Sequence, residues 1–260
     1  MRISFIGSGN VATHLAAAFK NAGHKIVQVY SPNYQNASLL AYHVGADAIS
    51  DFADIDAETD IFVIAVKDDA ILQIAQKLAV HQKLTVHTSG ATHIEAILQY
   101  NPLSGVFYPL QTFSKTKEVD FRNVPLCIEG GDEEIIGVLT QLAQTISNQV
   151  YQISSVQRKT LHLAAVFACN FPNALYAIAQ SLLAKQQLDF ELLRPLILET
   201  AQKVQESLPG EVQTGPAVRR DEKTMNMHME MLTHQPQLQT LYQSLSQAII
   251  KMDNPLNADK

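Results

Sequence analysis

Tryptophan is absent from this 260-residue chain, and cysteine occurs only twice. Cys127 and Cys169 lie in apolar stretches without CxxC spacing, so we expect both to be buried, reduced thiols. The nine histidines show no HExxH motif or other paired ligand spacing, and therefore no built-in metal site is expected. The cysteines and histidines thus predict neither a disulfide nor a metal site.

Long apolar runs are also missing, since no stretch approaches the ~20 residues that cross a bilayer. The opening MRISFIG reaches glycine after four mainly apolar positions, which is unlike a secretion signal. A formal net charge of -6 offers no phosphate-seeking surface for nucleic acid. Hydrophobic residues make up 47% of the chain, as in ordinary globular proteins. We expect a cytoplasmic protein with neither membrane nor nucleic-acid partners.

Strand and helix signals alternate through the first 153 residues. The segment 60–66 is a continuous apolar run of the kind buried on both faces of a parallel sheet. Alternation of this kind predicts an α/β fold, a Rossmann-type, doubly wound and mostly parallel sheet. The expected strands are 2–6, 25–30, 46–49, 60–66, 84–88, 106–108, 125–129 and 149–153.

Apolar stripes at helical spacing replace the strand signals after Ser154. They predict helices near 156–183, 190–208 and 238–249, the first of them kinked or split at Pro172. We therefore expect a dinucleotide-binding domain over 1–153 and an all-α domain over 154–260. The second domain would bind substrate and, given its long apolar stripes, support a homodimer.

A GxGxxA motif lies between the first strand and the first helix, where a dinucleotide site requires it. Gly7 permits a tight turn, Gly9 lets the backbone approach a pyrophosphate, and Ala12 allows the helix to pack closely on the strand. The helix N-terminus then presents free N–H groups to the phosphates. An ordinary strand-to-helix turn is the alternative. The expected cofactor contacts are Gly7, Ser8, Gly9, Asn10 and Val11.

The end of the second strand bears on the choice between the two nicotinamide cofactors. NAD enzymes usually carry an acidic residue there to hold the ribose 2′-hydroxyl, but this chain has Tyr30 and Ser31, followed by Pro32 and Asn33. Hydroxyl and amide groups tolerate a 2′-phosphate, although no arginine follows to bind it. We predict NADP as cofactor, contacted by Tyr30 and Ser31, with NAD as the less favoured alternative.

Ligands of such sheets lie beyond the carboxyl ends of the strands. Val66 and Lys67 end the fourth strand, and Thr88 and Ser89 follow the fifth, so all four are predicted to border the cofactor. Lys67 could instead be a solvated loop residue.

Reduction of a carbonyl or imine needs a proton donor near the heteroatom. The candidates are His87 near the end of the fifth strand, with His162 and Asn170 on the first helix of the second domain. Each has a structural alternative: His87 lies within an apolar strand, His162 interrupts an apolar stripe, and Asn170 adjoins the predicted kink at Pro172.

Three segments at the ends of the predicted strands, IGSGNVA, AVKDDAI and HTSGA, resemble pyrroline-5-carboxylate reductases. The wider group of relatives includes the deazaflavin-dependent NADP reductases and the 6-phosphogluconate dehydrogenase-like enzymes. More specifically, YPLQTF, LHLAAVFACNF and TGPAVRRD are similar to segments of an uncharacterised bacterial family of candidate NADP oxidoreductases. That resemblance covers nearly the whole chain and implies a Rossmann-like domain followed by a helical domain, with no substrate assigned.

The sequence departs from the wider group on the substrate side. Hydroxyacid dehydrogenases of that group carry an asparagine four residues after a catalytic lysine, whereas Lys159 is followed at that distance by Leu163. The serine- and threonine-rich segment of proline-forming reductases has no clear copy. We predict an NADP-dependent oxidoreductase acting on a small carbonyl or imine compound. A non-catalytic NADP(H) sensor and a deazaflavin-linked NADP reductase are the alternatives.

Overall fold

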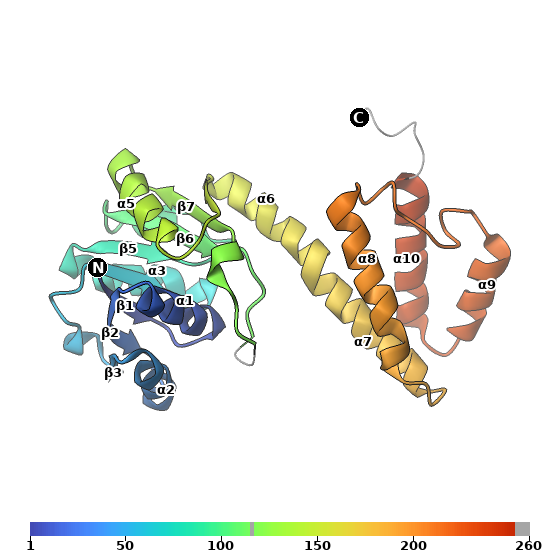
Figure 1. Ribbon diagram of the computed structural model, residues 1–260, viewed down its shortest axis with the longest axis horizontal. Helices are drawn as coiled ribbons and strands as arrows, with labels where there is room; N and C mark the ends of the chain where they lie inside the picture. The colour runs from blue at the N-terminus through green and yellow to red at the C-terminus, as the bar shows by residue number, and fades with distance from the viewer. Residues whose placement is uncertain (115–116, 253–260) are drawn as a thin grey trace. The chain divides into compact units, whose positions relative to one another are not determined.

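The computed structural model describes residues 1–114 and 117–252 (Figure 1). Contacts within the chain divide it into two compact units, Met1–Ala174 and a second that begins at Leu175. The predicted domain boundary lies earlier, at Ser154, which is the N-cap of the helix that begins at Ser155. The division of roles between a cofactor domain and a substrate domain stays a prediction.

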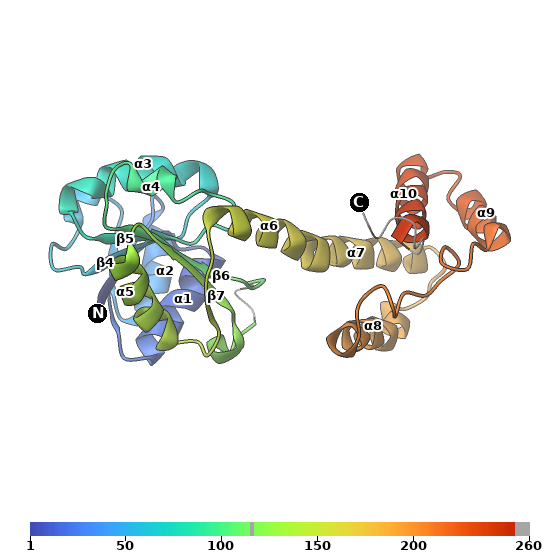
Figure 2. The same cartoon turned by 90° about the horizontal axis from the view of Figure 1, so that it is seen from above.

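An eight-stranded sheet forms the centre of the first unit (Figure 2). Its strand order is β3-β2-β1-β4-β5-β6-β7-β8, and every neighbouring pair is parallel except β6 and β7. The predicted fold class is therefore confirmed, with each expected strand overlapping an observed one. The strands are β1 (Arg2–Ile6), β2 (Lys25–Tyr30), β3 (Asp47–Ile49), β4 (Ile61–Ile64), β5 (Leu84–His87), β6 (Ser104–Pro109), β7 (Leu126–Gly130) and β8 (Val150–Gln152).

Helices cover both faces of this sheet, each face with its own apolar core. One core joins the sheet to α1 (Asn10–Asn21), α2 (Tyr34–Val44) and α5 (Glu133–Gln144). The other joins it to α3 (Asp68–Leu78) and α4 (Glu95–Leu98), which lie on the opposite side in Figure 2. Short 3-10 turns occupy Phe52–Asp54, Ala79–His81 and Phe121–Asn123. Burial on both faces explains why β4 reads as an unbroken apolar run.

The ends of these helices follow local chemistry. The Asn33 side chain caps α2 by accepting hydrogen bonds from Gln35 and Asn36, and Gly45 ends the helix in the left-handed conformation (φ 72°). Asp132 caps α5 in the same way. The Asn33 cap follows β2 at the edge of the sheet where the candidate site lies, whereas Asp132 follows the antiparallel β7 at the opposite edge.

The helical segment after β8 is α6 (Ser155–Ala165), a π-helical turn (Val166–Asn170) and α7 (Phe171–Ala184). The interruption predicted at Pro172 therefore takes the form of a π turn just before the proline, which relieves the loss of one backbone donor. Cys127 is buried as expected, but the prediction for Cys169 is wrong, because this thiol is exposed on the π turn.

The run Ser155–Ala184 is the one described helix that is long and apolar enough to cross a membrane, with 30 residues and a mean hydropathy of 1.3. One such helix is weak evidence for a membrane span, and unlike the core helix of a soluble protein its most apolar window is not buried. Its first turn also carries Arg158, which is buried in an ion pair with Glu129. The expectation that the chain has no membrane span is not overturned by this helix.

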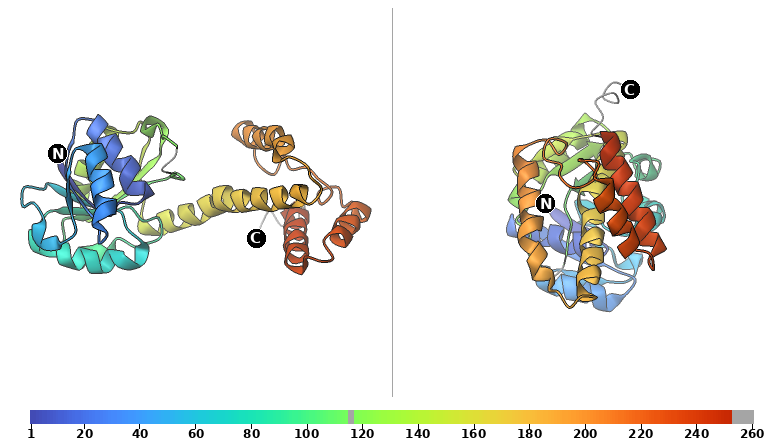
Figure 3. Two further views of the ribbon diagram at one scale, coloured as in Figure 1. Left: turned by 90° about the horizontal axis from the view of Figure 1, so that it is seen from below. Right: turned by 90° about the vertical axis from the view of Figure 1, so that its right-hand side faces the viewer.

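The second unit consists of helices joined by turns (Figure 3). After the end of α7 come a 3-10 turn (Phe190–Leu193), α8 (Arg194–Glu206), α9 (Glu222–Met231) and α10 (Pro236–Met252). Asp221 caps α9 by accepting a hydrogen bond from Thr224. In the described part of this unit, Ala217 and Leu232 alone are buried hydrophobic residues. The apolar stripes read from the sequence are thus left largely exposed.

Candidate functional site

A cleft of about 600 Å³ opens at the carboxyl ends of β1, β4 and β5 in the first unit. This is the edge at which open α/β sheets bind their ligands. The residues after β2, the end of β6 with the loop that follows it, and one side chain of α6 complete its walls. The lining residues are Gly7, Ser8, Gly9, Asn10, Val11, Ser31, Pro32, Ala65, Val66, Lys67, Asp68, Thr88, Ser89, Gly90, Tyr108, Pro109, Gln111 and His162.

Gly7 occupies a backbone conformation that only glycine adopts readily, with φ at 119°. A Cβ atom added at Gly7 would lie 2.2 Å from the carbonyl oxygen of Ala65, and the Gly7 N–H donates to the carbonyl of Tyr30 at 2.9 Å. Ala12 is fully buried where α1 crosses the sheet. The tight turn and the close helix packing predicted from the motif are both present.

Gly9 serves the ligand side of the same turn. It is the N-cap of α1, offers no side-chain cap, and the first turn of the helix carries no acidic residue. A Cβ atom at Gly9 would meet no other atom within 4 Å, so the space beside the helix N-terminus is open. A dinucleotide pyrophosphate fits this position, because free N–H groups and the positive end of the helix dipole favour an anion there.

The side chain of Asn10 points to the protein rather than to a ligand. Its Nδ2 donates to the carbonyl of Phe113 at 2.9 Å, and one turn later His14 Nε2 hydrogen-bonds the carbonyl of Ser114 at 2.8 Å. The ring of His14 also stacks on Phe113, with centroids 5.1 Å apart. The loop after β6 is thereby attached to α1, and any cofactor contact of Asn10 would come from its backbone.

At the end of β2, Ser31 lines the cleft but Tyr30 does not. The Tyr30 ring packs on Phe52 at a centroid distance of 4.3 Å, and burial, with a contribution from Asp51, raises the pKa of its hydroxyl. The predicted cofactor contact of Tyr30 is therefore not supported. The residues that line the cleft after β2 include no acidic side chain. The sequence predicted this absence, which would let the site tolerate a 2′-phosphate.

The two loops predicted to border the cofactor both line the cleft. Val66 and Lys67 line the cleft after β4, and Thr88 and Ser89 line it after β5. Lys67 is the N-cap of α3 and supplies a positive charge at the wall. The described residues contain no group of three or more His, Cys, Asp or Glu side chains placed to hold a metal ion.

His162 is the candidate acid–base residue that reaches the cleft. It is half-buried on α6, and its Nδ1 lies 3.3 Å from the hydroxyl oxygen of Tyr108. A Cβ atom added at Gly90 would lie 2.6 Å from the same Nδ1, so only glycine leaves room for the imidazole. Burial, and then the neighbouring Cys127, raise the pKa of Tyr108, against a smaller opposing effect of Arg158. The Tyr108 hydroxyl therefore stays protonated at neutral pH.

The other two candidate catalytic residues lie elsewhere. His87 is fully buried beneath the cleft wall, where its Nδ1 accepts the Ser89 N–H at 3.2 Å. Burial, followed by the positive charges of Arg158 and His93, lowers the pKa of His87 to about 3. Asn170 is exposed on the π turn and does not line the cleft. Both placements favour the structural alternatives.

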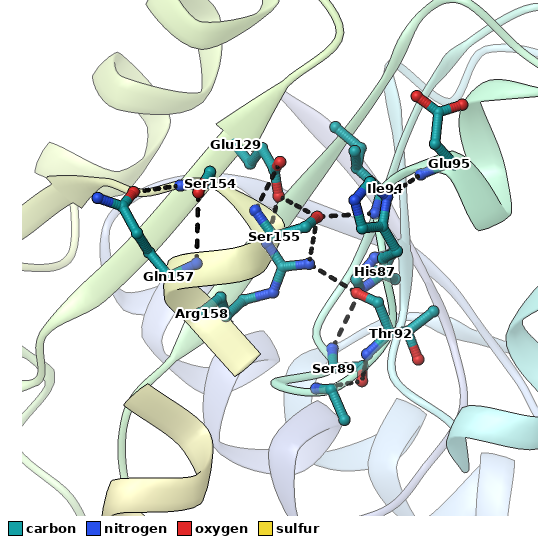
Figure 4. Close-up of polar contacts among 12 residues, drawn as sticks. His87, Ser89, Thr92, Ile94, Glu95, Glu129, Ser154, Ser155, Gln157 and Arg158 are labelled. Atoms are coloured by element: carbon teal, nitrogen blue, oxygen red, sulfur yellow. Dashed lines mark hydrogen bonds and ion pairs between the residues drawn. The ribbon is translucent and has the colours of Figure 1, made fainter. Parts of the chain in front are cut away.

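A buried polar cluster beside the cleft was not predicted (Figure 4). Arg158 on α6 pairs with Glu129 on β7 and donates to the carbonyl of Thr92, while Ser155 bonds both to Glu129 and to the loop after β5. Single arginine and glutamate residues show no pattern along the sequence, so nothing there indicates that they meet. The GxGxxA turn, by contrast, is a local motif.

Two family models match the chain. Residues 2–89 match "NADP oxidoreductase coenzyme F420-dependent", and residues 124–249 match "Domain of unknown function (DUF2520)". A candidate NADP oxidoreductase from Bacteroides fragilis is 43% identical, with 96% of this chain and 98% of that chain covered and a TM-score of 0.92. No curated protein matches.

More distant solved structures share the fold. An imine reductase from Myxococcus stipitatus, solved in complex with NADP+, has a TM-score of 0.67 at 13% identity, covering 100% of this chain and 95% of that one. A pyrroline-5-carboxylate reductase from Coxiella burnetii has a TM-score of 0.58 at 16% identity, with 96% of both chains covered.

Proposed function

The chain belongs to the family of NADP oxidoreductases represented by the Bacteroides fragilis protein, and from that premise we propose that it transfers hydride between NADP(H) and a small carbonyl or imine compound. One observation carries the choice of reaction. The Tyr108–His162 pair, an acid–base couple, faces the same cleft as the glycine turn that suits a dinucleotide pyrophosphate. A binding protein without chemistry would need no such pair.

The residues present fit the cofactor. The first turn of α1 and the open space at Gly9 would hold the pyrophosphate, with Lys67 supplying a positive charge in the wall. Ser31 and Pro32, which follow β2, would lie near the adenine ribose and present no carboxylate to repel a 2′-phosphate. When bound, the nicotinamide ring supplies or accepts the hydride.

The protein's own task is to orient the substrate and to manage one proton. The Tyr108 hydroxyl and Nδ1 of His162 share a hydrogen bond, and in the imidazolium form Nδ1–H would donate to the hydroxyl oxygen. During reduction the imidazolium would give its Nε2 proton to a carbonyl oxygen or imine nitrogen and become neutral imidazole, which keeps the proton on Nδ1. In the reverse direction the same nitrogen accepts the proton. This gives the two side chains distinct roles, with His162 as the donor and Tyr108 as its support.

The first test is a fluorescence titration of the full chain with NADPH and NADH. Wild type is expected to bind NADPH more tightly, and Gly9→Asp should weaken NADPH binding about a hundredfold, because its carboxylate would stand against the pyrophosphate. Gly137→Asp is the matched control. Gly137 lies on α5 outside the cleft with equally open space, so this variant adds the same charge and should bind normally.

A screen of small carbonyl and imine compounds follows, with NADPH oxidation as the readout and His162→Gln as the variant. We expect turnover by wild type and a loss of about a hundredfold or more in the variant, the usual range for a general acid. Unchanged turnover would remove His162 from the mechanism. Tight NADPH binding without turnover of any such compound would favour a sensor, and turnover only with a deazaflavin would favour the deazaflavin-linked reductase.

A further inference from the structure

We propose that Arg158 is a positioning residue: with Glu129 and Ser155 it fastens α6 to the loop after β5, and so sets where the His162 imidazole stands in the cleft. The significance of that position rests on the proposed role of His162. Arg158 itself is 1% exposed and does not line the cleft, so it would act through other groups rather than on a ligand.

The guanidinium of Arg158 joins three parts of the fold (Figure 4). Nη1 forms an ion pair with the carboxylate of Glu129 on β7. Nη2 donates to the backbone carbonyl of Thr92, in the loop after β5, at 2.6 Å, and to Oγ of Ser155 at 3.1 Å. Arginine alone among the side chains carries this fixed, planar set of donors, so a lysine could keep the charge but not the geometry.

Ser155 completes the connection from the first turn of α6. Its N–H donates to Oε1 of Glu129 at 2.8 Å and its hydroxyl donates to Oε2 at 2.7 Å. The same hydroxyl oxygen accepts the N–H of Ile94, from the loop after β5, at 3.0 Å. The loop, the strand and the helix are therefore held by directional bonds within a few residues of one another.

His162 follows Arg158 by four residues, which places both on one face of α6, a single turn apart. The imidazole packs against Gly90, which lies in the same loop as the Thr92 carbonyl that Arg158 holds. Both sides of the His162–Gly90 contact are thus tied to one guanidinium. A shift of α6 along or around its axis would change the distance from Nδ1 to Tyr108 as well.

The choice of buried charges supports a positioning role over simple anchoring. Apolar residues of similar volume often hold two elements together as well as a buried ion pair does, because removing two charges from water is costly. Hydrogen bonds with fixed directions specify one register, whereas apolar contacts tolerate sliding. The cluster places its directional bonds beside the one α6 side chain that lines the cleft.

The test follows the ring nitrogens of His162 by NMR in the full chain labelled with 15N-histidine, assigned with His162→Gln. Tyr108→Phe defines the signature of an imidazole without its partner. We expect Arg158→Lys and the double variant Arg158→Met with Glu129→Gln to move the His162 signals toward that signature. The double variant leaves no unpaired buried charge, so it keeps the test decisive if Arg158→Met alone fails to fold.

The matched control is Arg194→Met, which removes an arginine from an exposed ion pair with Glu191 in the second unit. It should leave the His162 signals unchanged. NADPH affinity should stay within about threefold in the Arg158, Glu129 and Arg194 variants, none of which changes a residue that lines the cleft. Wild-type His162 signals in both Arg158→Lys and the folded double variant would overturn the proposal. Failure of the proposed function would show differently, as an absence of NADPH binding or turnover in wild type itself.

Discussion

Nearly all the buried apolar surface of the chain belongs to one of its two units. Every buried hydrophobic residue in the described ranges except Ala217 and Leu232 lies before Leu175. The first unit closes two cores around its sheet, while the helices of the second expose large apolar side chains such as Leu196, Leu198 and Leu245. Helices of this length draw most of their stability from packing an apolar face. The second unit therefore lacks the stabilisation that the first unit gains from its own buried apolar side chains.

We propose that a further surface covers the exposed apolar side chains of the helical part of the chain. The exposed stripe begins on the long helical segment of the first unit, where Leu163, Phe167 and Phe171 recur every four residues on one face. Exposed apolar patches of this kind mark association sites. We propose a second copy of the chain as the occupant, in keeping with the homodimer expected from the sequence.

The largest expected effect is a loss of stability in the first unit. Phe107 is 1% exposed and lies 5.5 Å from Phe19, ring centroid to ring centroid, within the core. Phe107→Ala should lower the free energy of unfolding by about 3–5 kcal/mol, because it leaves a cavity in a closed core. Chemical denaturation followed by circular dichroism measures it. A self-contained unit requires a loss that is the same at every protein concentration.

The next effect concerns association. Phe167 is 64% exposed, and Phe167→Glu should weaken dimer formation by about 2 kcal/mol or more, about 30-fold in Kd, if a partner copy covers this stripe. Analytical ultracentrifugation over a range of concentrations measures it. Tyr42→Glu is the control, since Tyr42 is 85% exposed on α2, away from the stripe. A wild-type protein that is monomeric throughout would refute the dimer.

The smallest effect comes from acid. In the folded protein the pKa of His87 is about 3, so the imidazole stays neutral above that pH, whereas in the unfolded chain it takes up a proton near pH 6.5. Between these values the unfolded state binds more protons, so the free energy of unfolding falls as the pH falls. We expect about 1.5 to 2 kcal/mol of this loss between pH 6.5 and 5.

Urea denaturation at pH 7, 6 and 5 measures this dependence. His87→Gln keeps an acceptor for the Ser89 N–H but has no imidazole to titrate, so its stability should depend less on pH over the same range. Equal slopes for the two proteins would show that His87 is not held neutral in the folded state.

Local motifs could be predicted from the amino-acid sequence. The turn at Gly7 and Gly9 depends on backbone conformation and on the absence of a side chain, which are properties of a few adjacent residues. The apolar run of β4 and the caps at Asn33 and Asp221 are equally local. The sheet, the cofactor turn and the loops that border the cleft were predictable for this reason.

For candidate site residues proposed from residue type alone, only the fold shows which of them reach the cleft. His87 and His162 were both reasonable proton donors in the sequence, yet one strand buries the first and one helix face carries the second to Tyr108. Tyr30 was expected at the cofactor, but the strand's last side chain turns to Phe52 instead. Each outcome depends on which neighbour lies across the sheet or along the helix, and sequence spacing does not contain that information.

The amino-acid sequence by itself determined the elements of this protein, the position of its dinucleotide turn and the edge of the sheet where a ligand would bind, because each depends on short-range pattern and steric limits. The tertiary structure alone decided that His162 meets Tyr108, that Arg158 meets Glu129 and Thr92, and that the helices of the second unit bury few apolar side chains among themselves. These are contacts between residues far apart in the chain, and only packing in three dimensions brings them together.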